Sequence, residues 1–125
     1  HASRGRTPRT AIMFGEAGKI YVYLVYGMYY CLNIVTEQKD FPSAVLIRGA
    51  VLQESGEAVD GPGRLTRALG IDKSLNAKTL GRSAGLWIEE GVDIQKSRII
   101  AGQRIGVAYA GEWAQKLWRF YLISA

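Results

Sequence analysis

Residues 20–33 constrain the fold of this chain more than any other stretch. They comprise thirteen uncharged residues, five of which are tyrosines, followed by a single amide side chain. β-Branched and aromatic residues favour strands, whose surface is pleated and half buried. Gly27 divides the stretch into two short segments, and glycine readily takes the positive φ that a tight turn requires. The pattern therefore predicts a β-hairpin over residues 19–35, with residues 26–28 at its tip.

The composition predicts one globular domain over residues 1–125. The hydrophobic fraction is 48%, which is typical of a folded domain and argues against disorder. The single cysteine, Cys31, cannot form an internal disulfide and fits a small buried thiol. Residues 20–33 are too few for a membrane-spanning helix, which takes about 20 apolar residues, so no membrane partner is expected. The net charge of +5 indicates either a polyanionic partner or simply a soluble surface.

Turn residues and hydrophobic patterning divide the rest of the chain into short elements. The predicted segments are an irregular stretch over residues 1–18, loops over 36–42 and 53–60, a central strand over 43–52, a short helix over 61–70, and strands over 86–88, 98–101, 105–109 and 117–123. Pro62 suits the first turn of the helix, and Gly70 suits its end. This content predicts an α+β fold with a mostly antiparallel sheet.

Several polar and aromatic positions are candidates for binding or chemistry. Arg48 is the only charge in its predicted strand and needs a partner if it points inward, although a structural ion pair or an edge-facing side chain would also explain it. The amide of Asn33 can read the edge of a base, or it can simply bond to backbone at the end of a strand. Tyr21 and Tyr23 share one face of their strand, with Tyr26 on the other face or in the turn. Such rings stack on bases or pack in a core.

The predicted helix has two different faces, and the remaining motifs exclude several chemistries. Leu65, Ala68 and Leu69 fall on one face of the helix, and Arg64 and Arg67 fall on another. The chain has one histidine and no ligand spacing for zinc, so neither a metal nor a cofactor is expected. Taken alone, the residues indicate a basic, aromatic-rich domain that binds nucleic acid through a wedge-like hairpin.

Five groups of motifs follow one another along nearly the whole chain. They are HASRGRTPR (residues 1–9) with MF (13–14), YVYLVYGMY (21–29) through Asn33, AVLIR (44–48), GPGRLTRAL (61–69), and RIGV (104–107) with GEW (111–113) and WRFY (118–121). Together they resemble the alkyladenine (3-methyladenine) DNA glycosylase family. The resemblance implies a single domain with a curved antiparallel sheet and a protruding hairpin. It also implies a monomeric, monofunctional enzyme that excises alkylated or deaminated purines from double-stranded DNA.

The resemblance assigns roles in base flipping, in which a damaged purine leaves the stack and a side chain takes its place. Tyr26 matches the intercalating tyrosine, and Tyr23 and His1 match rings that sandwich the flipped base. Asn33 matches the amide that disfavours guanine, and Leu46 matches a wall of the base pocket.

The resemblance also assigns residues around the reaction centre and along the DNA. Arg48 matches the arginine that helps to hold the attacking water, and the backbone carbonyl of Ile105 is its expected companion. Residues expected to contact the DNA backbone or to support the hairpin are Arg6, Met13, Gly27, Met28, Arg64 and Arg104. Water is the expected nucleophile, and no lyase step is expected.

One part of the family pattern falls outside this sequence. A glutamate within a Glu-x-Glu-Ala-Tyr segment activates the water in the family, and here that segment would precede His1. The chain is therefore expected to be truncated at its N-terminus and impaired on its own, because loss of a general base typically costs 10²- to 10⁴-fold in rate. The alternatives are a non-catalytic DNA-lesion binding module and, more distantly, a β-rich single-strand binder.

Overall fold

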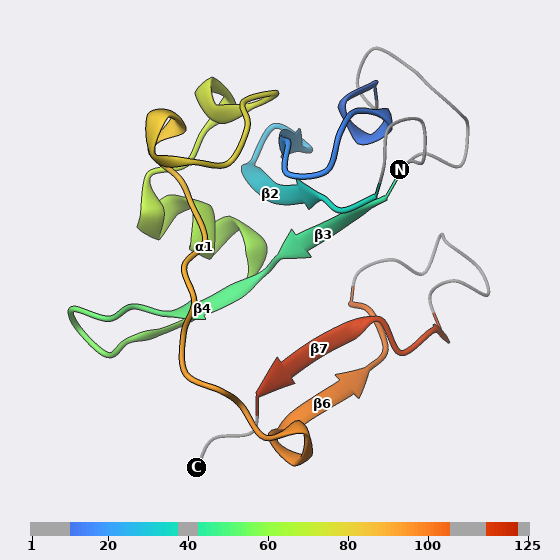
Figure 1. Ribbon diagram of the computed structural model, residues 1–125, viewed down its shortest axis with the longest axis vertical. Helices are drawn as coiled ribbons and strands as arrows, with labels where there is room; N and C mark the ends of the chain where they lie inside the picture. Colours follow the sequence, from blue (N-terminus) through green and yellow to red (C-terminus); the bar gives the residue numbers. More distant parts are fainter. Residues whose placement is uncertain (1–10, 38–42, 106–114, 123–125) are drawn as a thin grey trace. The chain divides into compact units, whose positions relative to one another are not determined.

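The computed structural model describes residues 11–37, 43–105 and 115–122. The chain divides into two compact units, His1–Ile88 and Glu89–Ala125. Within the described residues the strands pair antiparallel in three small sheets, and α1 (Pro62–Leu69) is the only α-helix (Figure 1). The predicted α+β class, with antiparallel pairing and few helices, is confirmed. A single domain over residues 1–125 stays a prediction.

The first unit contains two sheets and the helix. Its three-stranded sheet has the order β1 (Ile20–Val25), β2 (Tyr29–Val35), β3 (Ala44–Ile47), and its second sheet pairs β4 (Gly49–Val51) with β5 (Ala58–Asp60). Helix α1 is Pro62–Leu69, and short 3₁₀ turns are formed by Ala11–Phe14, Lys73–Leu75 and Arg82–Ala84. The second unit pairs β6 (Ile99–Gly102) with β7 (Arg119–Leu122) after a 3₁₀ turn, Lys96–Arg98.

Strands β1 and β2 form the predicted hairpin. Val25 pairs with Tyr29, and the backbone N–H of Met28 donates to the carbonyl of Val25 at 2.8 Å. The two residues inside this turn, Tyr26 and Gly27, have φ of 51° and 67°. Positive φ at both central positions is the pattern of a type I′ turn, which matches the twist of the flanking strands. Glycine takes this conformation freely, whereas for a bulky tyrosine it is strained.

One face of the three-stranded sheet carries a cluster of buried hydrophobic residues. Ile20, Val22 and Leu32 are buried on this face together with Ile71, which follows α1. The partly buried residues packed around them are Tyr30, Ile34, Ile47, Leu75, Leu80, Ala84 and Leu86. Because side chains alternate along a strand, the other face of the same sheet carries the remaining residues of β1, β2 and β3, of which Tyr21, Cys31 and Val35 are also buried.

The outer edge of β1 is covered by residues 76–80. The backbone N–H of Ile20 donates to the carbonyl of Lys78 at 2.8 Å, and the N–H of Ala77 donates to the carbonyl of Ile20 at 2.8 Å. One step further along, the N–H of Val22 donates to Oδ1 of Asn76 at 2.9 Å. A side-chain amide thus replaces a backbone carbonyl where the covering segment ends, and the edge of the sheet keeps its hydrogen bonds.

We expect Asn76→Ala to lower the free energy of unfolding by about 1 kcal/mol, because it leaves the N–H of the buried residue Val22 without its acceptor. Urea denaturation followed by circular dichroism measures this loss. The control is a substitution at Asp72, another polar residue that precedes the segment covering β1. Hydrogen bonds from the Ser74 side chain and backbone N–H hold the pKa of Asp72 below its ordinary value. Asp72 is exposed and outside the edge contact, so Asp72→Asn should cost less than Asn76→Ala.

The predicted central strand over residues 43–52 is wrong in two respects. Strand β3 is an edge strand of its sheet, and the segment divides at Arg48, which lies between β3 and β4 in different sheets. The predicted loop over 53–60 contains β5, which pairs with β4. The apolar pattern covers both parts of the segment, but the pairing partners differ: β2 pairs with residues 44–47, and β5 pairs with residues 49–51.

Other predicted boundaries are confirmed in part. Helix α1 begins at Pro62 and is followed by Gly70 with φ of 67°, as predicted. Its buried residues are Leu65 and Thr66, whereas Ala68 and Leu69 are exposed, which corrects the expected apolar face. The hydroxyl of Thr66 reaches the carbonyl of Tyr30 at 3.0 Å, and this contact helps to set the orientation of the short helix on β2.

The turn-rich second half departs most from prediction. Residues 86–88 are not a strand; Leu86 makes one isolated bridge with Gly81. The strands expected at 98–101 and 117–123 are found as β6 and β7, and Ile105 lies in a bend. Residues 1–10, 38–42, 106–109 and 123, within other predicted segments, lie outside the described residues. No helix in the described part of the chain is long and apolar enough to cross a membrane.

Candidate functional site

Three of the candidate pocket residues lie on the sheet face opposite Ile20, Val22 and Leu32. Asn33 pairs directly with Leu46 of β3, and Tyr23 lies on the neighbouring strand, where it pairs with Cys31. Directly paired residues of adjacent strands project to the same face, and residues two apart on one strand do so as well. The register therefore places Tyr23, Asn33 and Leu46 together on one face, as a common pocket requires.

The three side chains differ in burial. Asn33 is 7% exposed, Tyr23 is half buried and Leu46 is 38% exposed. The ring of Tyr23 lies against the buried ring of Tyr21, with centroids 5.1 Å apart and the planes tilted by 40°. This contact orients Tyr23 while leaving part of its surface open.

Asn33 is oriented by the backbone. Its Nδ2 donates to the carbonyl of Tyr21, its cross-strand partner, at 3.3 Å. This hydrogen bond to the backbone is the structural role that the sequence offered for Asn33 as an alternative to reading a base. It engages one of the two N–H groups of the amide, which carries a second donor and an acceptor. The hydrogen bond therefore fixes the orientation of the amide, and the remaining donor and acceptor can still contact a base.

The hairpin carries the candidate wedge at its tip. Tyr26 is 89% exposed and Met28 is 73% exposed. Both lie in the turn with Gly27, at the end of the strands that carry the candidate pocket residues. Tyr26 is thus in the turn, one of the two places that the sequence allowed. The hydrogen bond from the N–H of Met28 to the carbonyl of Val25 closes the turn, and the ring of Tyr26 projects from that turn.

Arg48 has the ion pair that the sequence raised as an alternative. One of its terminal guanidinium nitrogens lies 3.7 Å from Oδ1 of Asp60, and the two side chains are 27% and 87% exposed. The neighbouring pairs support this contact: Gly49 pairs with Asp60, and the N–H of Gly61 donates to the carbonyl of Arg48 at 2.8 Å. A glycine opposite Asp60 leaves room for its carboxylate to reach across. Ion pairs this exposed contribute little to stability, so the contact mainly orients the guanidinium.

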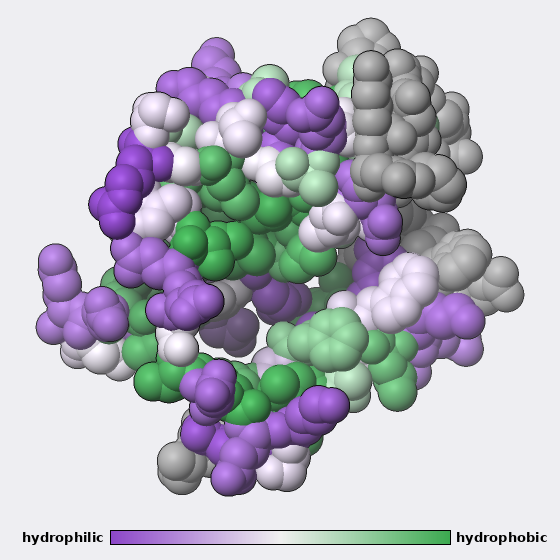
Figure 2. All heavy atoms as spheres, viewed as in Figure 1, coloured by the Kyte–Doolittle hydropathy of each residue, from purple (hydrophilic) through white to green (hydrophobic). Residues whose placement is uncertain are grey.

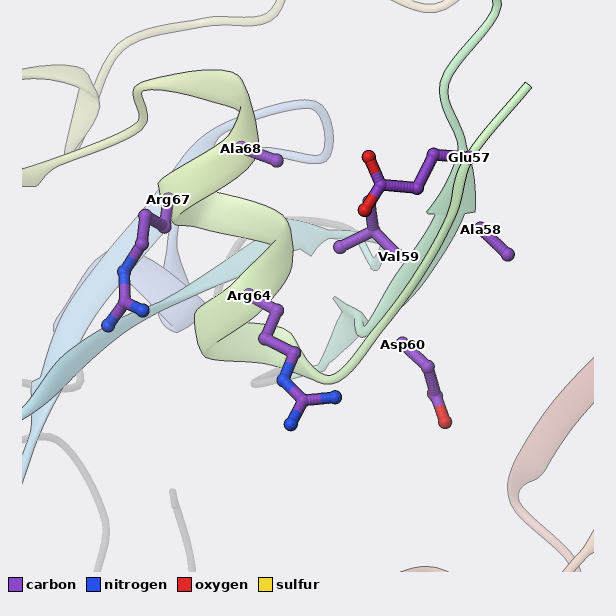
Figure 3. Close-up of a pocket in the computed structure, with 7 residues that line it drawn as sticks. All are labelled: Glu57, Ala58, Val59, Asp60, Arg64, Arg67 and Ala68. Carbon is purple, nitrogen blue, oxygen red and sulfur yellow. The ribbon is translucent and has the colours of Figure 1, made fainter. Parts of the chain in front are cut away.

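An open hollow of about 400 Å³ lies between the tip of the hairpin and the start of α1. It is lined by Met28 and Tyr29, by residues 60–63, and by Arg64 and Arg67. The adjoining hollow shares Asp60 and both arginines. Figure 3 shows Arg64 and Arg67 projecting from α1 and Asp60 projecting away from the helix. On the face drawn in Figure 2, hydrophobic residues are exposed among hydrophilic ones.

Helix and hairpin approach closely at Gly63. A Cβ atom on Gly63 would lie 2.7 Å from Cγ of the Tyr29 ring, which is closer than atoms of a packed interior approach. Only a glycine therefore lets the first turn of α1 lie against Tyr29. The contact places Arg64, the next residue, close to the tip of the hairpin.

The other expected site residues are spread over the chain. Met13 is half buried in the 3₁₀ turn Ala11–Phe14. Arg104 and Ile105 follow β6 in the second unit, and Ile105 is 58% exposed. The pairing of the Ile105 carbonyl with Arg48 stays a prediction. His1 and Arg6 lie outside the described residues.

Comparison with known proteins identifies the family. A family model described as methylpurine-DNA glycosylase matches residues 1–125. The chain belongs to this family. A relative from Methanocella arvoryzae is 44% identical over 97% of this chain and 66% of its own length. Relatives from Legionella pneumophila (strain Corby) and Myxococcus xanthus are 48% and 43% identical, each over 98% of this chain, and over 67% and 64% of their own lengths.

All three relatives are provisionally named 3-methyladenine DNA glycosylases, and this chain spans about two thirds of their length. The family predicted from the sequence motifs is confirmed. Reasoning from the sequence did not find Asp60 or the contact between Gly63 and Tyr29. Asp60 ends a segment predicted as a loop, and no local pattern marks its pairing with β4. Gly63 did carry a signal, because a glycine inside a helical pattern often marks a close approach.

Proposed function

We propose that residues 1–125 supply the DNA-binding and base-recognition part of a DNA repair glycosylase. In this proposal the protein flips an alkylated or deaminated purine out of double-stranded DNA and hydrolyses its N-glycosidic bond with an activated water. The observation that carries it is the register of the three-stranded sheet. That register groups Tyr23, Asn33 and Leu46 on one face, on a hairpin that ends in the exposed ring of Tyr26.

The tip of the hairpin acts as the wedge. An aromatic ring that enters the duplex replaces the stacking lost when a purine leaves, and this stabilises the bent and unstacked DNA. Tyr26 is suited to this because its ring is almost fully exposed and its backbone is held in a closed turn. Gly27 and Met28 complete the turn and support the ring.

The sheet face receives the flipped base. The ring of Tyr23 stacks on the purine, Leu46 forms an apolar wall, and the amide of Asn33 disfavours guanine by clashing with its exocyclic amine. His1 is the proposed second ring of the sandwich. A base that cannot match the polar groups of such a pocket leaves them buried without a hydrogen-bond partner. This penalty discriminates strongly between substrates.

Arg48 helps to hold the attacking water, with the carbonyl of Ile105 as its proposed companion. The water oxygen forms a bond to C1′ of the sugar while the bond from C1′ to the purine nitrogen breaks, and the purine leaves with the bonding electrons. A cationic alkylated purine leaves as a neutral base. The family resemblance assigns the water's proton to a glutamate that residues 1–125 do not supply, so we expect slow release by this stretch alone.

Base release and binding together test the proposal. Residues 1–125 are incubated with duplexes that carry hypoxanthine or 7-methylguanine, and the free base is measured by liquid chromatography. Fluorescence anisotropy compares a duplex with an abasic-site analogue, the undamaged duplex and the single strand. Slow release with preference for the lesion duplex supports the glycosylase. Lesion binding without release supports the alternative, a non-catalytic lesion-binding module. Equal affinity for damaged and undamaged duplexes overturns both.

A further inference from the structure

We propose that Arg119 is a positioning residue for base release, because its guanidinium anchors the short segment that carries Ile105. This inference rests on the proposed function, in which the carbonyl of Ile105 helps to hold the attacking water. Arg119 itself contacts neither the substrate nor the water in this mechanism. It acts on the reaction through the backbone of residues 103–105.

Three contacts hold the guanidinium of Arg119 in place. Its Nε donates to the carbonyl of Gln103 at 2.9 Å. Its Cζ lies 4.6 Å from the centroid of the Tyr121 ring, which projects from the same face of β7 because the two residues are two apart on one strand. Gly102 pairs with Arg119, and a Cβ atom there would lie 3.0 Å from a terminal nitrogen of the guanidinium. The glycine therefore leaves room for a guanidinium that lies across β6.

The anchored carbonyl lies just beyond the last strand pair. The pairing of β6 with β7 ends at Gly102 and Arg119, and Gln103 is the next residue. Ile105 follows two positions later in a bend, and two residues of chain reach at most about 7 Å. Ile105 is 58% exposed, so burial of its side chain does not hold the bend in place. The charge-assisted hydrogen bond from Arg119 therefore limits where the carbonyl of Ile105 can lie.

A lysine at position 119 separates this role from two simpler ones. Lysine keeps the positive charge and the apolar stem, but it lacks the Nε–H that reaches Gln103 and the planar group that lies over Tyr121. If Arg119 acted only as a charge toward DNA, Arg119→Lys would keep both the affinity and the rate. If Arg119 only stabilised the pair of strands, Arg119→Lys would lower the melting temperature and leave the rate of the folded protein unchanged.

A positioning residue instead changes the rate and leaves the affinity. The proposed wedge, Tyr26, and the pocket residues Tyr23, Asn33 and Leu46 belong to the first unit, whereas Arg119 belongs to the second. Recognition of the lesion should therefore persist in Arg119→Lys while the hydrolytic step slows.

The test measures single-turnover release of hypoxanthine from duplex DNA, with residues 1–125 at saturating concentration. Arg119→Lys should slow release at least about 10-fold, because a misplacement of about 1 Å can cost about 100-fold in rate. Affinity for the abasic-analogue duplex, measured by fluorescence anisotropy, should stay unchanged. The matched control is Arg82→Lys, the same exchange at another arginine over an aromatic ring, since Cζ of Arg82 lies 4.7 Å from the centroid of Trp87. This control should change neither quantity.

A second variant and a second measurement examine the anchor itself. Gly102→Ala places a methyl group 3.0 Å from the terminal nitrogen of Arg119 and displaces the guanidinium, so it should also slow release. Hydrogen–deuterium exchange of residues 103–105 should become faster in both Gly102→Ala and Arg119→Lys. Exchange in β1 and β2 should match the parent protein, because the opening is local.

Each outcome decides one point. Release by Arg119→Lys at the parent rate, or a loss of lesion affinity in that variant, overturns the positioning role while the proposed function stands. Unchanged exchange of residues 103–105 overturns the anchor. A parent protein that releases no base, or that does not prefer the lesion duplex, overturns the proposed function and the positioning role with it. Circular dichroism melting of every variant confirms that each difference arises in folded protein.

Discussion

Replacing Tyr26 with asparagine should weaken binding to a lesion-containing duplex about 5- to 150-fold and should also stabilise the free protein. The loss follows from stacking, since an aromatic ring on a base contributes about 1–3 kcal/mol. The gain follows from the turn, because Tyr26 has φ of 51° and asparagine takes this left-handed conformation more readily than a bulky residue. Relief of about 1 kcal/mol raises the melting temperature by a few degrees.

The opposite signs of these two effects separate a wedge from a structural residue. Fluorescence anisotropy with the abasic-analogue duplex gives the affinity, and circular dichroism melting gives the stability. Tyr26→Phe is the matched control, because it keeps the ring and the strained turn and should keep most of the affinity. If Tyr26→Asn binds the lesion duplex as tightly as the parent protein, the hairpin tip does not act as a wedge.

Replacing Gly63 with alanine should lower the free energy of unfolding by about 1–3 kcal/mol. The added methyl would lie 2.7–2.8 Å from three atoms of Tyr29, so either the ring or the helix must move. Because Tyr29 begins β2, the displacement reaches the hairpin that carries Tyr26. Lesion binding should therefore fall along with stability. Urea denaturation and anisotropy measure the two effects.

A second substitution shows whether the clash is the cause. In Gly63→Ala combined with Tyr29→Ala two of the three atoms that the methyl meets, Cγ and Cδ2 of the ring, are gone and only Cβ remains, so the double variant should lose less stability than the sum of the single losses. Gly91→Ala is the control for the glycine change itself, since nothing lies within 4 Å of a Cβ there, and it should change stability by about 0.5 kcal/mol or less. Strict additivity of the Gly63 and Tyr29 variants would falsify the close-contact explanation.

The hairpin and the helix were predictable because their signals are local. A run of β-branched and aromatic residues around Gly27 specifies two strands and a turn, and a proline and a glycine bracket α1. Alternation along a strand also predicts that Tyr21 and Tyr23 share a face. The motifs identified the family, because five of them in order are far more specific than any one alone.

The grouping of the candidate site was not local. Tyr23, Asn33 and Leu46 come from three strands, and a shift of one residue in the register would move a whole strand's side chains to the opposite face. The pairing of Asn33 with Leu46 depends on where β3 docks on β2. The division at Arg48 likewise depends on β5, a segment too short to show a pattern of its own.

The sequence by itself determined the hairpin, its tyrosine tip, the limits of α1, the basic charge and the family. These features depend on dihedral preferences, side-chain alternation and motif order, all of which are properties of neighbouring residues. Only the tertiary structure decided that Asp60 lies against Arg48, that Gly63 lets α1 approach Tyr29, and that two arginines line a hollow beside the wedge. Those contacts join residues 12 to 39 positions apart along the chain, and they form only when sheets and helix pack together.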